Sequence, residues 1–329
     1  MVLIASDFKP VFFKAYGYAS KEFASPNQLN TRFNLGSINK IFTKIAVVQL
    51  VKKGQLSLDD KLGKFLPDYP NAEAREKVTV RHLVNMTSGI GDFFGPEFRA
   101  TPKDFIRHNR DFLRFFAAKP LAFEPGSKEM YSNGGYVVLG EIISVVSGMD
   151  YYEYVRKNIF EPAGMKDSDW FEADAVVENV AEGYTRQVDN QEKRENEEKK
   201  LNPAMIPWRK NIYSRPARGS AAGGGYATAE DLLRFARALY EGRLLSGAWT
   251  DWVFTGVEPH KLKAAGVETN QNRLNIGLAG GAPGINAVLE LDGQNRYTII
   301  VLANYDPPAA GDVARMVRRY LKAVKNQEN

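Results

Sequence analysis

A serine and a lysine stand three residues apart, as Ser37 and Lys40, at the start of a long apolar stretch. On a helix, side chains at this spacing lie on one face, about 5–6 Å apart at Cβ. At the first turn of a helix, the serine is also close to backbone N–H groups that lack a partner within the helix. The pair therefore offers a nucleophile, an amine that can take its proton and a place for negative charge. These are the requirements for attack on an ester or an amide.

Spacing alone does not select this pair, because Ser6 and Lys9 have the same separation. Ser6 stands between two short apolar runs, which predicts a hairpin turn. Ser37 instead precedes apolar residues at helical spacing, which predicts a helix over residues 37–53. Only the second pair has the helical context that the chemistry needs.

The composition argues against several other chemistries. The chain has 329 residues, of which 44% are hydrophobic and none is cysteine, so it can form a large core but no disulfide, thiolate nucleophile or cysteine-ligated metal. His82, His108 and His260 are far apart and lack metal-ligand spacing, and we therefore expect neither a metal nor another cofactor. The sequence also has no Gly-x-Ser-x-Gly motif, which argues against an α/β-hydrolase triad.

The charge pattern disfavours nucleic acid as a partner, because the net charge is +5 and the Lys and Arg residues are interleaved with acids. No apolar run approaches the ~18 residues of a membrane span. Residues 1–5 are too short for a signal peptide, so we expect a cytoplasmic location for the chain as written, or a periplasmic or secreted one if its N-terminus is trimmed. The expected partner is a small-molecule ester or amide, and no oligomeric state follows from the sequence.

The remaining pattern predicts strands at both ends of the chain and helices between them. Strands are expected in a hairpin over 1–20 and at 275–280, 287–291 and 297–303, and helices at 80–86, 102–118, 133–147, 150–160, 229–239 and 311–324. Such an order predicts an α/β (α+β) fold with an antiparallel sheet flanked by helices. We expect an α/β domain of residues 1–54 and 205–329, a mostly helical inserted domain of residues 55–204, and an active site at their interface.

Two further segments carry groups suited to chemistry. Tyr131 and Asn133 lie at a predicted junction between a loop and a helix, where a tyrosine can shuttle a proton and an asparagine can orient a carbonyl or the lysine. A packed tyrosine beside a helix cap is the alternative interpretation. Residues 278–284 end a predicted strand with small side chains, which either let a ligand approach the backbone or simply form a tight turn.

Taken together, these motifs resemble the serine β-lactamase-like superfamily, which includes class C β-lactamases, low-molecular-weight penicillin-binding proteins and class VIII carboxylesterases. The resemblance extends from Arg32 to the end of the chain. It rests on the co-linear segments Phe33–Thr43, Gly54–Asp60, Val80–Val84 with Thr87–Gly89, Tyr131–Asn133 with Gly135 and Tyr136, Pro162–Met165 and Ala222–Gly225.

The resemblance implies a role for each candidate residue. Ser37 is expected to be the nucleophile, Lys40 its base and Tyr131 a second proton carrier. The backbone N–H groups of Ser37 and Gly281 are expected to form an oxyanion hole. The implied substrate-binding residues are Asn133, Leu278, Ala279 and Gly280, and the implied fold is an α/β domain plus a helical domain with the site between them.

The third motif departs from the superfamily pattern, because it usually begins with Lys or His and here begins with Leu278. In the superfamily that cation binds a substrate carboxylate, so its absence counts against penicillin and peptidoglycan substrates. The sequence therefore favours a carboxylesterase that hydrolyses neutral short or medium-chain esters through an acyl-enzyme. A β-lactamase or D-amino-acid peptidase is the alternative. A non-catalytic scaffold or peptidoglycan-binding homologue is a third interpretation, against which the intact Ser37, Lys40 and Tyr131 argue.

Overall fold

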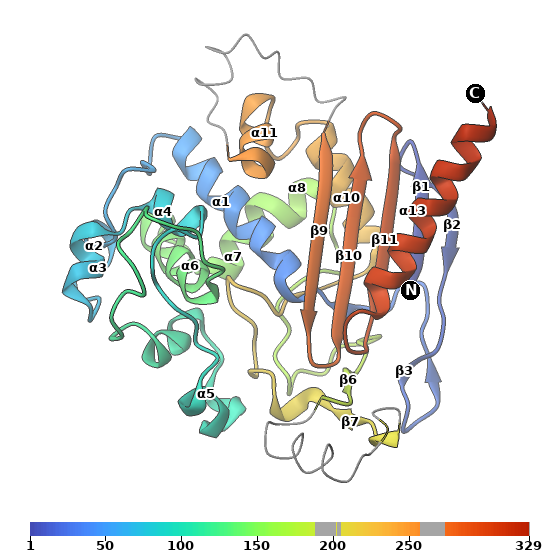
Figure 1. Ribbon diagram of the computed structural model, residues 1–329, viewed down its shortest axis with the longest axis horizontal. Coiled ribbons are helices and arrows are strands. Elements are labelled where there is room, and N and C mark those ends of the chain that lie inside the picture. Colours follow the sequence, from blue (N-terminus) through green and yellow to red (C-terminus); the bar gives the residue numbers. More distant parts are fainter. Residues whose placement is uncertain (188–201, 203–204, 257–273, 329) are drawn as a thin grey trace.

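The computed structural model describes residues 1–187, 202, 205–256 and 274–328, and its centre is a five-stranded sheet (Figure 1). The strand order is β2-β1-β11-β10-β9, and every neighbouring pair is antiparallel. The strands are β1 (Val2–Ser6), β2 (Lys9–Lys14), β9 (Asn275–Ala282), β10 (Ile285–Asp292) and β11 (Tyr297–Ala303). Val2 pairs with Val301, so the two ends of the chain share one sheet and the predicted α/β class with an antiparallel sheet is confirmed.

Helices cover both faces of this sheet because its strands are apolar on both sides. Side chains alternate between the faces along a strand. Ile300 and Leu302 face the main core, which also contains residues of α1 (Lys40–Lys52) and α10 (Ala229–Tyr240). Ile299 and Val301 face the other way and pack against Ala310 and Ala314 of α13 (Ala309–Glu328), which crosses the outer face in Figure 1.

The remaining helices and short strands lie between β2 and β9 in the sequence. Figure 1 shows α2 to α6 grouped on the side of α1 away from the sheet. The helices are α2 (Leu62–Phe65), α3 (Ala72–Lys77), α4 (Val80–Val84), α5 (Pro96–Ala100), α6 (Asn133–Ser147), α7 (Tyr151–Val155), α8 (Glu161–Ala163) and α11 (Ala248–Thr255). The short strands are β3 (Tyr18–Ser20), β4 (Ser25–Pro26), β5 (Phe33–Asn34), β6 (Tyr184–Thr185), β7 (Arg209–Lys210) and β8 (Tyr226–Ala227).

The ends of several helices follow from side-chain caps. The Ser132 hydroxyl accepts a hydrogen bond from the Gly135 backbone N–H, 2.8 Å away, and so begins α6. Gly148 ends the same helix with a left-handed φ of 68°. Thr79 and Thr228 cap α4 and α10 in the same way. The predicted starts of these three helices are confirmed, and α6 packs on α1 with Asn133 in its first turn.

The single helix predicted over 102–118 is wrong. This region contains two 3-10 segments, η2 (Lys103–Phe105) and η3 (Asn109–Phe115). The Asp111 carboxylate accepts hydrogen bonds from the backbone N–H groups of Arg107 and His108, at 2.9 and 2.7 Å. Side-chain bonds of this kind occupy backbone donors and compete with α-helix formation.

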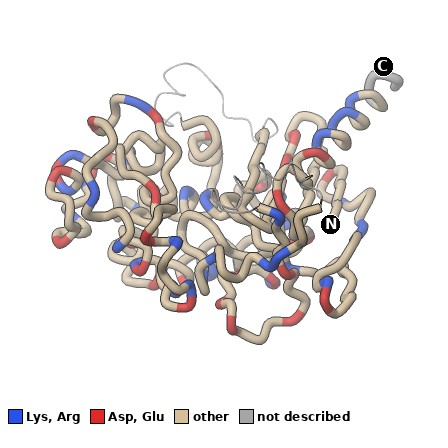
Figure 2. Tube along the Cα trace, turned by 60° about the horizontal axis from the view of Figure 1, so that its bottom comes forward, with Lys and Arg blue, Asp and Glu red and all other residues tan. Residues whose placement is uncertain are grey.

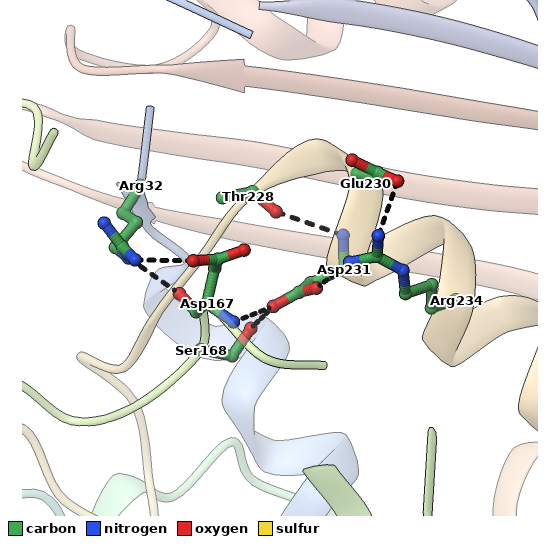
Figure 3. A network of polar contacts seen from close by, with 7 residues as sticks. All are labelled: Arg32, Asp167, Ser168, Thr228, Glu230, Asp231 and Arg234. Atoms are coloured by element: carbon green, nitrogen blue, oxygen red, sulfur yellow. Dashed lines mark hydrogen bonds and ion pairs between the residues drawn. The ribbon is translucent and has the colours of Figure 1, made fainter. Parts of the chain in front are cut away.

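A polar network fixes the segment that leads to Ser37 (Figure 3). The buried Asp231 carboxylate of α10 accepts from the Asp167 backbone N–H at 2.7 Å and from the Ser168 hydroxyl at 2.8 Å. Arg32 in turn donates to the Asp167 carboxylate at 2.5 Å and to its carbonyl oxygen at 3.1 Å. Because Arg32 immediately precedes β5, the network ties α10 to the strand that enters the turn carrying Ser37.

Figure 2 shows Lys and Arg interspersed with Asp and Glu along the chain. Within the described residues, no helix combines the length and apolar character needed to cross a membrane. The same part of the chain contains no group of three or more His, Asp or Glu side chains arranged to hold a metal ion, and His260 lies outside it. The division into domains 1–54 with 205–329 and 55–204 stays a prediction.

Candidate active site

Ser37 lies in a 3-10 turn, η1 (Gly36–Asn39), and α1 begins only at Lys40. The prediction of one continuous helix from Ser37 therefore needs this correction. Gly36 enters the turn with a φ of 51°, in the left-handed region that a side chain rarely adopts. The η1 turn packs against the edge strand β9, so the Ser37 backbone lies next to that strand.

Two glycines make this close approach possible. A Cβ on Gly280 would lie 1.9 Å from the Leu35 carbonyl oxygen and 2.9 Å from the Ser37 nitrogen. A Cβ on Gly36 would lie 3.0 Å from the Gly281 nitrogen. The backbones of η1 and β9 therefore meet here without side chains between them, with the Ser37 nitrogen next to Gly280 and the Gly281 nitrogen next to Gly36.

Replacing Gly280 with alanine is expected to lower the free energy of unfolding by about 1–3 kcal/mol, because the new methyl group must displace backbone rather than a side chain. Thermal denaturation of the purified variant measures this loss. Gly277→Ala is the matched control, since it adds the same group to the same strand where no atom lies within 4 Å of the new Cβ. Equal melting temperatures for the two variants would contradict the proposed close approach.

The structure brings four of the predicted side chains together. The Ser37 hydroxyl oxygen lies 2.6 Å from the Tyr131 hydroxyl oxygen and 3.2 Å from the Lys40 Nζ atom. Lys40 is buried, and its Nζ atom donates to Asn133 Oδ1 at 2.6 Å and to the Ala222 carbonyl oxygen at 2.5 Å. The predicted pairing of Ser37 with Lys40 is therefore a direct contact, and Tyr131 contacts the same oxygen, with its ring centroid 4.8 Å from the Lys40 Nζ atom.

The surroundings of these groups change their proton affinities. Burial lowers the pKa of Lys40 to about 7, against the opposing effect of the nearby Asp92 carboxylate. Partial burial and the same carboxylate raise the pKa of Tyr131, although its hydrogen bond with Ser37 acts in the other direction. Near neutral pH a large fraction of Lys40 is thus uncharged, while Tyr131 keeps its proton.

Asp92 is a member of this cluster that the sequence did not reveal. Its carboxylate accepts from the Asn133 side-chain amide at 2.6 Å and from the Phe94 backbone N–H at 3.1 Å. With its NH₂ group held by Asp92, Asn133 must turn its oxygen toward Lys40. An acid between glycines and phenylalanines, just after the Thr87–Gly89 motif, was the available signal.

The loop that supplies the Ala222 carbonyl oxygen is itself held in place through the two residues before it. The Thr43 hydroxyl donates to the Ala221 carbonyl oxygen at 2.6 Å. The Trp170 indole donates to the Ser220 carbonyl oxygen at 3.1 Å. The loop that carries Ala222 is thereby fixed against the helix that carries Lys40.

A cavity of about 700 Å³ opens beside Ser37. Its lining includes the predicted residues Ser37, Tyr131, Asn133, Ala279, Gly280 and Gly281, together with Phe93, Phe94, Phe112 and Phe171. Leu278 is not part of this lining, because its side chain packs against the main core. Arg215 is the one charged residue among the described residues that line the cavity, and the sequence did not single it out.

An antiparallel α/β scaffold that holds a serine in contact with a buried lysine and a tyrosine is the architecture of a class of serine hydrolases. The chain belongs to the Beta-lactamase family, whose model matches residues 1–323.

Individual relatives agree with this membership. Penicillin-binding protein 4* of Bacillus subtilis (strain 168) is 29% identical over 316 residues, which are 92% of this chain and 67% of that protein. The crystal structure of a penicillin binding protein from Bacillus halodurans is 30% identical, with a TM-score of 0.80 over 97% of this chain and 94% of that chain. A D-amino acid amidase from Ochrobactrum anthropi SV3, complexed with D-phenylalanine, shares the fold at 24% identity, with a TM-score of 0.74 over 99% and 94% of the two chains.

Proposed function

We propose that this protein is a carboxylesterase that hydrolyses short or medium-chain esters, neutral around the scissile bond, through an acyl-enzyme on Ser37. The observation that carries the proposal is the contact of one hydroxyl with both an amine and a phenol, at 3.2 and 2.6 Å, beside an apolar cavity. A serine hydroxyl is a weak nucleophile until a base accepts its proton. Lys40 supplies that base, and Tyr131 supplies a second group that can carry the proton onward.

The hydrogen bonds of Lys40 fit an uncharged amine. A neutral amine has two N–H donors and one lone pair. In the protonated amine the three donors bond to Ser37, Asn133 and Ala222. In the neutral amine the two donors stay with Asn133 and Ala222, which leaves the lone pair for the Ser37 proton. Tyr131 then donates to the Ser37 oxygen, so the proton path runs from Tyr131 through Ser37 to Lys40. As Ser37 attacks the ester carbonyl, its proton passes to Lys40. Tyr131 then gives its proton to the leaving alcohol and regains one from the protonated Lys40, so both groups return to their starting states.

The developing oxyanion would be stabilised by the backbone N–H groups of Ser37 and Gly281. The glycine contacts between η1 and β9 support this arrangement, because they bring the two nitrogens to the same end of the cavity. Donors of this kind typically contribute about 2.7–4 kcal/mol each to the transition state. Water then hydrolyses the acyl-enzyme, with Lys40 or Tyr131 accepting its proton.

The cavity wall supports an ester with an apolar acyl group. Phe93, Phe94, Phe112 and Phe171 present ring surface that an alkyl or aryl chain can cover. Position 278 of β9 carries a leucine that packs into the core, and so provides no cation beside the scissile bond. The names of the relatives support a second candidate function, hydrolysis of β-lactams or D-amino-acid amides. Comparing the rates at which the enzyme hydrolyses esters and β-lactams distinguishes the two candidates.

The expected result is that kcat/KM for 4-nitrophenyl butyrate exceeds that for nitrocefin or penicillin G at least tenfold. A lost charge-assisted hydrogen bond to the β-lactam carboxylate is worth roughly 1.5–3 kcal/mol, which corresponds to about a ten- to hundredfold loss in kcat/KM. Steady-state assays of the three substrates on one enzyme preparation measure the ratio. Efficient nitrocefin turnover with weak ester hydrolysis would favour the second candidate instead.

A further inference from the structure

Arg215 stands on a rigid part of the cavity wall. It follows the 3-10 turn η6 (Asn211–Tyr213), and its backbone N–H donates to the Asn211 carbonyl oxygen at 3.2 Å. The buried Asn211 side chain donates to the Pro283 carbonyl oxygen at 2.9 Å, which fixes this turn to the end of β9. Pro216 restricts the backbone of the preceding arginine further. The position of Arg215 relative to β9 is thus set by the fold.

The guanidinium group of Arg215 has no partner within the part of the chain that the structure describes. It is half-buried, yet no described residue forms a hydrogen bond or an ion pair with its side chain, and no acidic residue is found among the described residues of the cavity wall. Other half-buried arginines are satisfied: Arg156 pairs with Asp169 at 2.8 Å, and Arg218 donates to the Trp170 carbonyl oxygen at 2.9 Å. A partly desolvated cation without a counter-ion is costly. Arg215 lines the cavity that contains Ser37, and it also lines a small neighbouring pocket to which Glu182 contributes.

We propose that Arg215 is a specificity-determining residue that binds a carboxylate carried by the substrate. This inference rests on the proposed function, because it takes ester hydrolysis at Ser37 as the reaction. The planar guanidinium group matches the two oxygens of a carboxylate, and an anion within the cavity meets no opposing acid on the described wall. The phenylalanine side chains of the same cavity suit a methylene chain. The substrate class is therefore a monoester of an aliphatic dicarboxylic acid, with its ester carbonyl at Ser37 and its free carboxylate at Arg215.

This site differs from the cation that the third motif would supply. That cation would stand at position 278 of β9, whereas Arg215 lies on the loop that follows η6. The lack of a cation at 278 and its presence at 215 together favour an ester that is neutral near the reacting carbonyl and anionic at its far end.

The test compares matched esters. Mono-4-nitrophenyl adipate and suberate are paired with 4-nitrophenyl hexanoate and octanoate, which have the same chain lengths but end in a methyl group. The measured quantity is the ratio of kcat/KM for the acid ester to kcat/KM for its neutral counterpart. Arg215→Gln is expected to lower this ratio about ten- to hundredfold, mainly through KM, because the contact is present in ground and transition states alike. Arg215→Lys should restore part of the ratio.

Arg319→Gln is the matched control, since it removes the same charge from an exposed position on α13 and should keep the wild-type ratio. Calorimetric binding of hexanoate, with hexanamide as its neutral counterpart, gives a readout that does not depend on catalysis. If the wild type hydrolyses none of the esters but hexanoate binds and Arg215→Gln abolishes that binding, the proposed function fails and the carboxylate site stands. If Arg215→Gln keeps both the wild-type ratio of kcat/KM values and the wild-type affinity for hexanoate, the inference is wrong.

Discussion

Replacing Ser37 with alanine is expected to reduce kcat for 4-nitrophenyl butyrate by about 10⁴-fold or more, because the variant has no oxygen with which to form the acyl-enzyme. The loss should be in kcat rather than in KM, since the cavity that holds the acyl chain remains. The fold should be retained, because among the described residues the hydroxyl bonds to Lys40 and Tyr131 alone, and all three groups belong to the site. Circular dichroism and thermal denaturation check that retention.

Ser6→Ala is the matched control, because Ser6 also lies three residues before a lysine. In the structure, Ser6 ends β1 and pairs across the hairpin with Lys9, so its replacement should leave esterase activity at the wild-type level. Mass spectrometry after treatment with a phosphonate ester should locate the adduct on the peptide that contains Ser37. An adduct at Ser6, or loss of activity in Ser6→Ala alone, would place the nucleophile elsewhere.

The parts of the fold that the sequence predicts are those with local causes. Ser132, Thr79 and Thr228 each bond a backbone N–H three residues later, so the starts of α6, α4 and α10 are visible from a few residues. The strands β10 and β11 are visible because their apolar side chains occupy both faces, and β9 because turns separate it and its neighbours. Long-range pairing of β1 with β11 follows only from the presence of strands at both ends.

The parts that the sequence does not predict have causes distant along the chain. Residues 109–115 form a 3-10 segment while the Asn109 side chain bonds to the Val137 carbonyl oxygen, at 2.7 Å, on another element. Asp92 enters the site because Asn133 reaches it from α6, and Arg215 enters because Asn211 fixes its loop to the end of β9. These contacts have no periodic signature, whereas the spacing of Ser37 and Lys40 does.

The pH dependence of ester hydrolysis is expected to follow Lys40. With its pKa lowered to about 7 by burial, the amine is mostly neutral above pH 7 and mostly protonated below it. Only the neutral form can accept the Ser37 proton, so kcat/KM for a neutral ester should fall about tenfold per pH unit below pH 7 and level off above it. The ester itself does not titrate in this range, and Tyr131, whose pKa is raised, keeps its proton throughout.

Lys40→Arg should lower kcat/KM by about 10²–10⁴-fold, because a guanidinium group keeps the positive charge but cannot give up its proton. Lys44→Arg is the matched control on the same helix: burial lowers the pKa of Lys44 to about 8, and its amine lies over the Trp252 ring rather than beside Ser37. Lys44→Arg should keep the wild-type kcat/KM and the same fall in kcat/KM below pH 7. An active Lys40→Arg enzyme would show that another group accepts the serine proton. The same conclusion would follow if the fall of kcat/KM below pH 7 disappeared in Lys44→Arg but persisted when Lys40 is replaced.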